Sequence, residues 1–168
     1  MSQREAAESE ITTAREAADD KLVLAFGRLQ GAANRLEYLL GRALEEGCGI
    51  NHLTFEVLMI LGRAGPDGLP MRSIGQERVL STGGASRLVD RMEAAGLVIR
   101  TADATDRRGR RVRLTAAGEE TAVRAARIHA ENVRYFFLEP LPEEHRAQFV
   151  GDLRILSHSA RDALPRLR

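Results

Sequence analysis

Apolar residues recur every three or four positions near both ends of the chain. This spacing places them on one face of a helix, so it predicts long amphipathic helices at about 22–44 and 142–164. A further helix with the same repeat is predicted after Thr115, which we expect to be its N-terminal cap. Residues 1–20 lack strong periodicity and are predicted to form a polar N-terminal extension.

Turn residues divide the middle of the chain into shorter elements. Thr54 is predicted to cap a helix that ends at the "GPDG" turn of residues 65–68. Two short helices are expected next, at 70–80 and 85–96, with "STGG" between them. The second of these should stop at its terminal glycine, since glycine is the usual residue just past a helix end.

Two short apolar alternations, Leu97–Thr101 and Arg111–Thr115, predict a pair of strands joined by a tip. Two short helices followed by a hairpin make a winged helix-turn-helix, which we assign to residues 51–115. Residues 21–46 and 116–168 would then form a helical dimerisation region. The predicted fold class is mainly α (α+β), a winged helix-turn-helix lobe with long N- and C-terminal dimerisation helices.

Positive charge is concentrated between the two predicted strands. The chain of 168 residues has a net charge of only +1, yet "TDRRGRRVR" at 105–113 holds five arginines. Residues 86–113 carry eight arginines against four acidic residues, a net of +4, whereas residues 1–20 carry two against six, a net of −4. The second short helix, at 85–96, could enter the major groove of DNA, and a cationic hairpin beside it can reach phosphates or the minor groove. We therefore expect double-stranded DNA as a partner.

The segment "LVDRMEAAGLVIRTADATDRRGRRVRLTAAGEE", residues 88–120, resembles the recognition helix and wing of the MarR family of bacterial transcription regulators. The match includes the "LVDR", "GLV", "DRR" and "LT" groups at the family's spacing. The resemblance implies a homodimer whose terminal helices interlock and which binds a pseudo-palindromic operator. It also implies repression of transcription, and release from DNA when a small phenolic or other apolar anionic ligand binds.

The resemblance also implies roles for individual residues. Asp106 would pair with Arg108 and aim it into the minor groove, while Arg110 and Arg111 would reach phosphates. The residues expected to bind DNA from the recognition helix are Ser81, Thr82, Gly84, Ser86, Arg87 and, one turn on, Arg91. Surface ion pairs of Arg87 and Arg91 with Asp90 or Glu93 are the alternative for those two arginines, and Ser81 and Thr82 could serve as helix caps.

A ligand pocket is a further expectation, in a cleft between the dimerisation helices and the DNA-binding lobe. The residues of this predicted pocket are Phe26, Leu29, Phe55, Glu56 and Met59. Its apolar members are more often ordinary core residues than part of a ligand pocket. Glu56 and Arg87 also align with positions at which a urate-responsive branch of the family carries an acid and an arginine.

The residues with reactive or metal-binding side chains give little indication of a catalytic, redox or metal site. Cys48 is the single cysteine, which excludes an internal disulfide and a cysteine-rich zinc site. A redox-sensing regulator that uses Cys48 is an alternative, although nearby Glu45 and Glu46 would disfavour its thiolate. No histidine pair has a local ligand spacing, and no nucleophile or phosphate-loop motif is present. We therefore expect no enzymatic activity, no metal and no cofactor.

Composition adds a few limits. Aromatic residues are only 4% of the chain and Trp is absent, so the core must be built from Leu, Ala, Val and Ile. No apolar run approaches the length of a membrane span, and the polar N-terminus lacks the core of a signal peptide. A cytoplasmic protein without a membrane partner is expected. A winged-helix module that binds protein instead of DNA remains the alternative.

Overall fold

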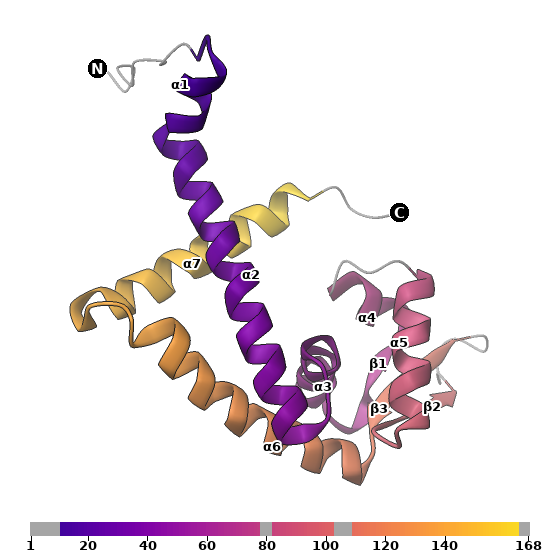
Figure 1. Ribbon diagram of the computed structural model, residues 1–168. Coiled ribbons are helices and arrows are strands. Elements are labelled where there is room, and N and C mark those ends of the chain that lie inside the picture. Colours follow the sequence, from indigo (N-terminus) through magenta and orange to yellow (C-terminus); the bar gives the residue numbers. More distant parts are fainter. Residues whose placement is uncertain (1–10, 78–81, 103–108, 165–168) are drawn as a thin grey trace. The chain divides into compact units, whose positions relative to one another are not determined.

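The computed structural model describes residues 11–77, 82–102 and 109–164, without the side chains of Gln76, Glu77 and Thr82. Helices dominate, and a single antiparallel sheet of three strands accompanies them in these ranges (Figure 1). The chain divides into two units, Met1–Tyr38 and Leu39–Arg168. None of the helices in the described ranges has the length and apolar character needed to span a bilayer. The predicted mainly α (α+β) fold class is confirmed.

The first unit contains a short helix and the first part of a long one. Thr13 caps α1 (Ala14–Asp19): its hydroxyl accepts from the Glu16 amide at 3.2 Å, and the Glu16 carboxylate accepts from the Thr13 amide at 3.0 Å. The hydroxyl of Thr12 also donates to this carboxylate, which lowers the pKa of Glu16. Asp20 then accepts from two amides at 2.9 Å where α2 (Lys21–Cys48) begins. Part of the predicted polar extension is therefore a capped helix.

The second unit holds the end of α2 and every described element that follows it in the chain. Its helices are α3 (His52–Ala64), the 3-10 turn η1 (Gly65–Asp67), α4 (Met71–Glu77), α5 (Thr82–Ala94), α6 (Ala116–Val133), the π-helical η2 (Arg134–Leu138) and α7 (Glu143–Ala163). Its strands are β1 (Leu69–Pro70), β2 (Val98–Ala102) and β3 (Arg110–Leu114), in the order β1-β3-β2. Helix α4 follows β1 directly, and the hairpin follows α5, as a winged helix-turn-helix requires (Figure 1).

Several predicted boundaries were wrong. Asn51, and not Thr54, caps α3: its side-chain oxygen accepts from the Thr54 amide at 2.8 Å, and Asn is the better cap. Helix α5 begins at Thr82, so both glycines of "STGG" lie inside its first turn. The hairpin strands lie one residue closer to the tip than predicted. Strand β1 was not predicted, because two residues are too few to show an alternation.

The core of the second unit joins helices to the sheet. Its largest fully buried side chains are Leu44, Val57, Leu58, Leu61, Ile74, Leu88, Val89, Met92, Val98 and Val112. They come from α2, α3, α4, α5, β2 and β3. Burying one such side chain is worth about 1.5–3 kcal/mol relative to leaving it exposed. Aliphatic residues thus hold the helix pair and the wing strands in one body, as the composition predicted.

The hairpin is closed at its base by a tight junction. Gly96 has φ 72° and ends α5, with hydrogen bonds from the Gly96 amide to Glu93 and from the Leu97 amide to Met92, each 2.9 Å. Thr115 donates its hydroxyl proton to the Gly96 carbonyl at 2.6 Å and accepts from the Gly118 amide at 2.9 Å. The predictions that Gly96 ends one helix and Thr115 caps the next are confirmed.

A histidine pair lies where α3 packs against α6. The ring centroids of His52 and His129 are 5.4 Å apart, and the Phe55 ring lies 4.5 Å from that of His129. The Nδ1 atom of His129 is buried without a hydrogen-bond partner. Burial, and then the positive charge of His52, lower the pKa of His129. The fold therefore favours the neutral form of His129.

Gly118→Ala should destabilise the protein. A Cβ at this position would overlap the carbonyl group of Leu97, which is backbone and cannot rotate away. We expect the free energy of unfolding to fall by about 1–3 kcal/mol, measured by urea denaturation at equal protein concentrations. Gly62→Ala in α3 is the control, because a Cβ there meets nothing within 4 Å. Equal stability of the two variants would show that the junction is not tight.

Stability should fall with acid through His129. Its pKa in the unfolded chain is about 6.5, and in the fold it is lower. The unfolded state therefore takes up the proton first, so the stabilisation is complete above pH 6.5 and is lost as pH falls through the folded pKa. His129→Phe should flatten this part of a plot of unfolding free energy against pH, whereas His145→Phe at an exposed position should not. An unchanged slope in His129→Phe would contradict the assignment.

Candidate nucleic-acid interface

Helix α5 has one buried and one exposed face. The side chains that it buries are Ala85, Leu88, Val89 and Met92. Gly84, Arg87 and Arg91 are exposed, and their spacing of three and four residues places them along one side of the helix. Ser86 is half-buried at the edge of this side. The predicted recognition residues of α5 that the structure describes are therefore brought together on an accessible surface.

The exposed arginines of α5 do not form the ion pairs considered above. Within the described part of the chain, neither Arg87 nor Arg91 has an ion-pair partner. The acidic residues Asp90 and Glu93 bind Arg100 instead. The alternative that Arg87 and Arg91 merely neutralise these two acids is wrong, and their positive charge remains available at the surface.

Arg100 fastens the wing to α5. Its amide donates to the Glu93 carboxylate at 3.0 Å, and its guanidinium forms ion pairs with both Glu93 and Asp90. A guanidinium nitrogen also donates to the Ser86 carbonyl at 3.4 Å. Burial works against the charge, but the two carboxylates outweigh it and raise the pKa of Arg100. The orientation of β2 relative to the exposed face of α5 is thereby fixed by an ion-pair network.

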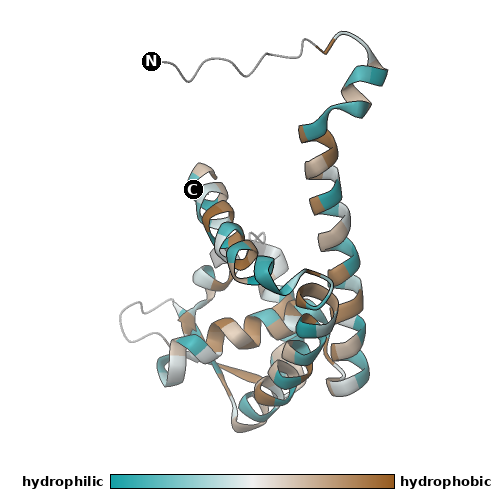
Figure 2. Ribbon diagram, turned by 90° about the vertical axis from the view of Figure 1, so that its left-hand side faces the viewer, coloured by the Kyte–Doolittle hydropathy of each residue, from teal (hydrophilic) through white to brown (hydrophobic). Residues whose placement is uncertain are grey.

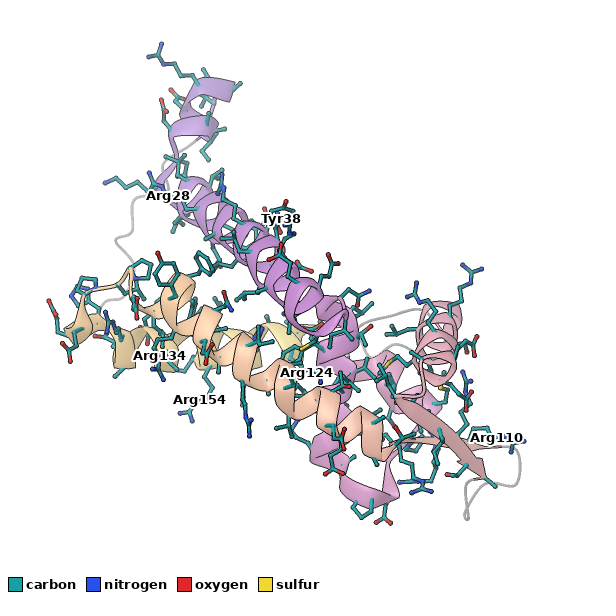
Figure 3. All side chains as sticks on the ribbon, turned by 60° about the horizontal axis from the view of Figure 1, so that its bottom comes forward. Arg28, Tyr38, Arg110, Arg124, Arg134 and Arg154 are labelled. Atoms are coloured by element: carbon teal, nitrogen blue, oxygen red, sulfur yellow. The ribbon has the colours of Figure 1, made fainter. Side chains whose placement is uncertain are left out.

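The two arginines predicted to contact phosphate from β3 differ in their surroundings. Arg110, at the start of β3 and paired with Ala102, is exposed and projects from the wing end, away from Arg134 and Arg154 (Figure 3). Arg111 is half-buried, and its Nε and Nη2 atoms donate to the carbonyls of Asp67 and Gly68, each at 2.8 Å. Arg110 therefore fits the predicted contact with phosphate better than Arg111 does.

Other predicted DNA contacts lie outside the described residues. These are Ser81, Asp106 and Arg108, so the orienting pair of Asp106 and Arg108 stays a prediction. Thr82 is the first residue of α5, but its side chain also lies outside the described atoms. The described site thus consists of the exposed side of α5 and the strands of the wing.

The predicted ligand pocket draws on both units of the chain. Phe26 and Leu29 belong to the first unit, where both are exposed, and the other three residues belong to the second. Phe55 is buried in the core of the second unit, Met59 packs against that core, and Glu56 is half-buried. The core interpretation is therefore confirmed for Phe55, and the pocket as a whole stays a prediction.

Reactive and metal-binding groups are sparse. Cys48 is a free, half-buried thiol at the end of α2 that packs against the core, and its redox role stays a prediction. Among the described residues, no group of three or more His, Cys, Asp or Glu side chains is arranged to hold a metal ion. Sequence reasoning missed the ion pairs of Arg100, the contacts of Arg111 with two distant carbonyls, and the pair of His52 and His129.

Comparison with known proteins agrees with this geometry. A sequence model of the MarR family matches residues 49–109. The chain is 31% identical over 96 residues to YkoM, an uncharacterised HTH-type transcriptional regulator of Bacillus subtilis; the match covers 57% of this chain and 61% of the length of that relative. The chain thus spans less than two thirds of this relative.

Two crystal structures from Streptomyces coelicolor match over nearly their whole lengths. AbsC, a MarR family transcriptional regulator, is 26% identical with a TM-score of 0.74, covering 90% of this chain and 97% of AbsC. Sco3205, a MarR family regulator in complex with DNA, is 28% identical with a TM-score of 0.75, covering 94% and 99%. Fold, element order and sequence agree, and the resemblance of the chain to the MarR family of transcriptional regulators is confirmed.

Proposed function

We propose that this chain is a sequence-specific DNA-binding regulator that acts as a homodimer on a pseudo-palindromic operator. The observation that carries the proposal is the exposed side of α5, where Arg87 and Arg91 have no ion-pair partner in the described structure while the opposite side is buried. A helix that presents cations beside a fixed hairpin suits the major groove and its flanking phosphates. The DNA complex of Sco3205, a relative of the same fold, supports this assignment.

The proposed contacts divide by what they touch. Gly84, Ser86 and Arg87 in the first turns of α5 would face base edges, and Arg91 and Arg110 would face phosphates. Ser81 and Thr82, where α5 begins, and Arg108 with its partner Asp106 complete the proposed set. Base contacts discriminate between sequences, whereas phosphate contacts strengthen binding to any sequence. A DNA-binding role also implies that the protein works in the cytoplasm.

A homodimer is proposed from apolar residues that are exposed on the terminal helices. In the second unit, α7 exposes Val150, Ile155 and Leu156, and apolar residues recur among polar ones along it (Figure 2). In the first unit, α2 exposes Leu22 and Phe26. Obligate dimers bury about 2,000 Å² or more in core-like interfaces, and such side chains would supply that surface. Residues 21–46 and 116–168 would thus form the dimerisation region and 51–115 the DNA-binding lobe.

Repression, and release by a small phenolic or other apolar anionic ligand, form the part of the proposal that rests on the family resemblance. The predicted pocket of Phe26, Leu29, Phe55, Glu56 and Met59 would be the place for that ligand. A thermal-shift screen of aromatic acids, followed by competition against bound DNA, would test it. A ligand that stabilises the protein and lowers its affinity for DNA would support release.

The wild-type protein should bind the DNA next to its own gene as a dimer. We expect a footprint with two half-sites about 10 bp apart, centre to centre, because a two-fold dimer presents two recognition helices. Affinity should fall steeply with salt, since cations on DNA are released on binding. Footprinting, fluorescence anisotropy at several salt concentrations and sedimentation equilibrium measure these properties. A monomer at micromolar concentration, or binding that is insensitive to salt, would contradict the proposal.

Arg87→Ala should reduce the preference for operator over scrambled DNA. A good bidentate contact with a base is worth about 1–3 kcal/mol of discrimination, so the difference in binding free energy between the two DNAs should shrink by that amount. Arg154→Ala is the matched control, because it removes the same charge from an exposed position on α7. If Arg87→Ala weakens binding to both DNAs by the same factor, Arg87 does not read bases.

A further inference from the structure

The side chain of Arg111 crosses from β3 to the turn that precedes β1. Its Nε donates to the Asp67 carbonyl and its Nη2 to the Gly68 carbonyl, each at 2.8 Å. The planar guanidinium presents parallel N–H donors, and the two consecutive carbonyls accept them as a fork. One side chain therefore binds a backbone segment more than forty residues away in the sequence.

Backbone pairing between this turn and β3 is short. Strand β1 has only two residues, Leu69 paired with Val112 and Pro70 paired with Arg111. Pro70 has no amide proton to donate to the ladder, so the backbone pairing of β1 with β3 is short of donors. The side chain of Arg111 supplies two donors at this point. Gly68, with φ 60°, brings the turn so close that a Cβ would overlap the Val112 carbonyl.

The position of β1 determines where the helix-turn-helix begins. Helix α4 starts at Met71, directly after Pro70, and packs against α5. A shift of the turn relative to β3 would therefore move the start of α4 relative to the wing. The three strands lie side by side with α4 leading off from β1 (Figure 1), so the fork of Arg111 lies between the wing and the helix pair.

We propose that Arg111 is a positioning residue, which sets the wing against the helix-turn-helix through the Asp67 and Gly68 carbonyls and does not act as a phosphate contact. The proposal rests on the proposed DNA binding, and it replaces the phosphate role that the family resemblance implied for Arg111. Arg110 is the natural comparison, because it is the adjacent residue, carries the same charge and is exposed.

Substitution of Arg111 by lysine separates the effect of the two parallel hydrogen bonds from the effect of the positive charge. Arg111→Lys keeps a cation that can contact phosphate but loses the planar pair of donors. We expect Arg111→Lys and Arg111→Ala to reduce the ratio of operator to scrambled affinity alike, by about tenfold, because both lose the paired hydrogen bonds that hold the turn. Neither should change the slope of log affinity against log salt. Arg110→Ala should flatten that slope by about one unit, and Arg110→Lys should restore it.

A measurement without DNA keeps the proposal testable on its own. Amide hydrogen exchange of residues 65–74 should become faster in Arg111→Lys than in the wild type and stay unchanged in Arg110→Lys. If Arg111→Ala flattens the salt slope while Arg111→Lys behaves as the wild type in both measurements, Arg111 is a phosphate contact and the proposal is overturned. If the wild type fails to bind DNA, the proposed function fails, but hydrogen exchange still decides whether Arg111 holds the turn.

Discussion

The second unit depends on the close approach of two backbones at the Leu97 carbonyl. This carbonyl accepts from the Thr115 amide at 3.1 Å, and Gly118 lies against it with no room for a side chain. Helix α5, strands β2 and β3, and helix α6 all begin or end within a few residues of this contact. Because the four elements meet there, this contact fixes the direction in which the hairpin extends from the helices. The ion pairs of Arg100 then fix β2 against α5, farther along the hairpin.

Five arginines of α5 and the wing strands act in two ways. Arg100 forms ion pairs with acidic side chains, and Arg111 donates hydrogen bonds to backbone carbonyls, so both arginines hold elements of the protein together. Arg87, Arg91 and Arg110 are exposed. A count of arginines in the sequence would treat all five as one basic surface. The structure separates those that shape the surface from those that present charge on it, which is the distinction a mutational study needs.

Local rules predicted what depends on neighbouring residues. Thr115 was identified as a cap and Gly96 as a helix end because the groups that bind them lie close by in the chain. The cap of α3 was placed wrongly, since Asn51 and Thr54 are both cap residues at a plausible start. The periodicity of apolar residues predicted the long helices, and the motifs at 88–120 indicated a resemblance to the MarR family. Each of these signals is contained in a short stretch of sequence.

Contacts between distant residues were not predictable in this way. Nothing in the sequence pairs Arg100 with Asp90 and Glu93 in preference to Arg87 or Arg91. The partners of Arg111 are carbonyls, which every residue carries, so no side chain marks them. The ligand pocket and the pair of Asp106 and Arg108 remain predictions, because one draws on two units and the other lies outside the described residues.

The division of α5 into two faces bears on how the proposed recognition of DNA could diverge between related proteins. Its buried face is constrained by the core through Leu88, Val89 and Met92. Its exposed face carries Arg87 and Arg91, which form no ion pair with other described residues and whose replacement would leave that core intact. After gene duplication, one copy could therefore acquire a new operator by a few substitutions on the exposed face. The same separation would let an engineer build mutually independent regulators on a single unchanged scaffold.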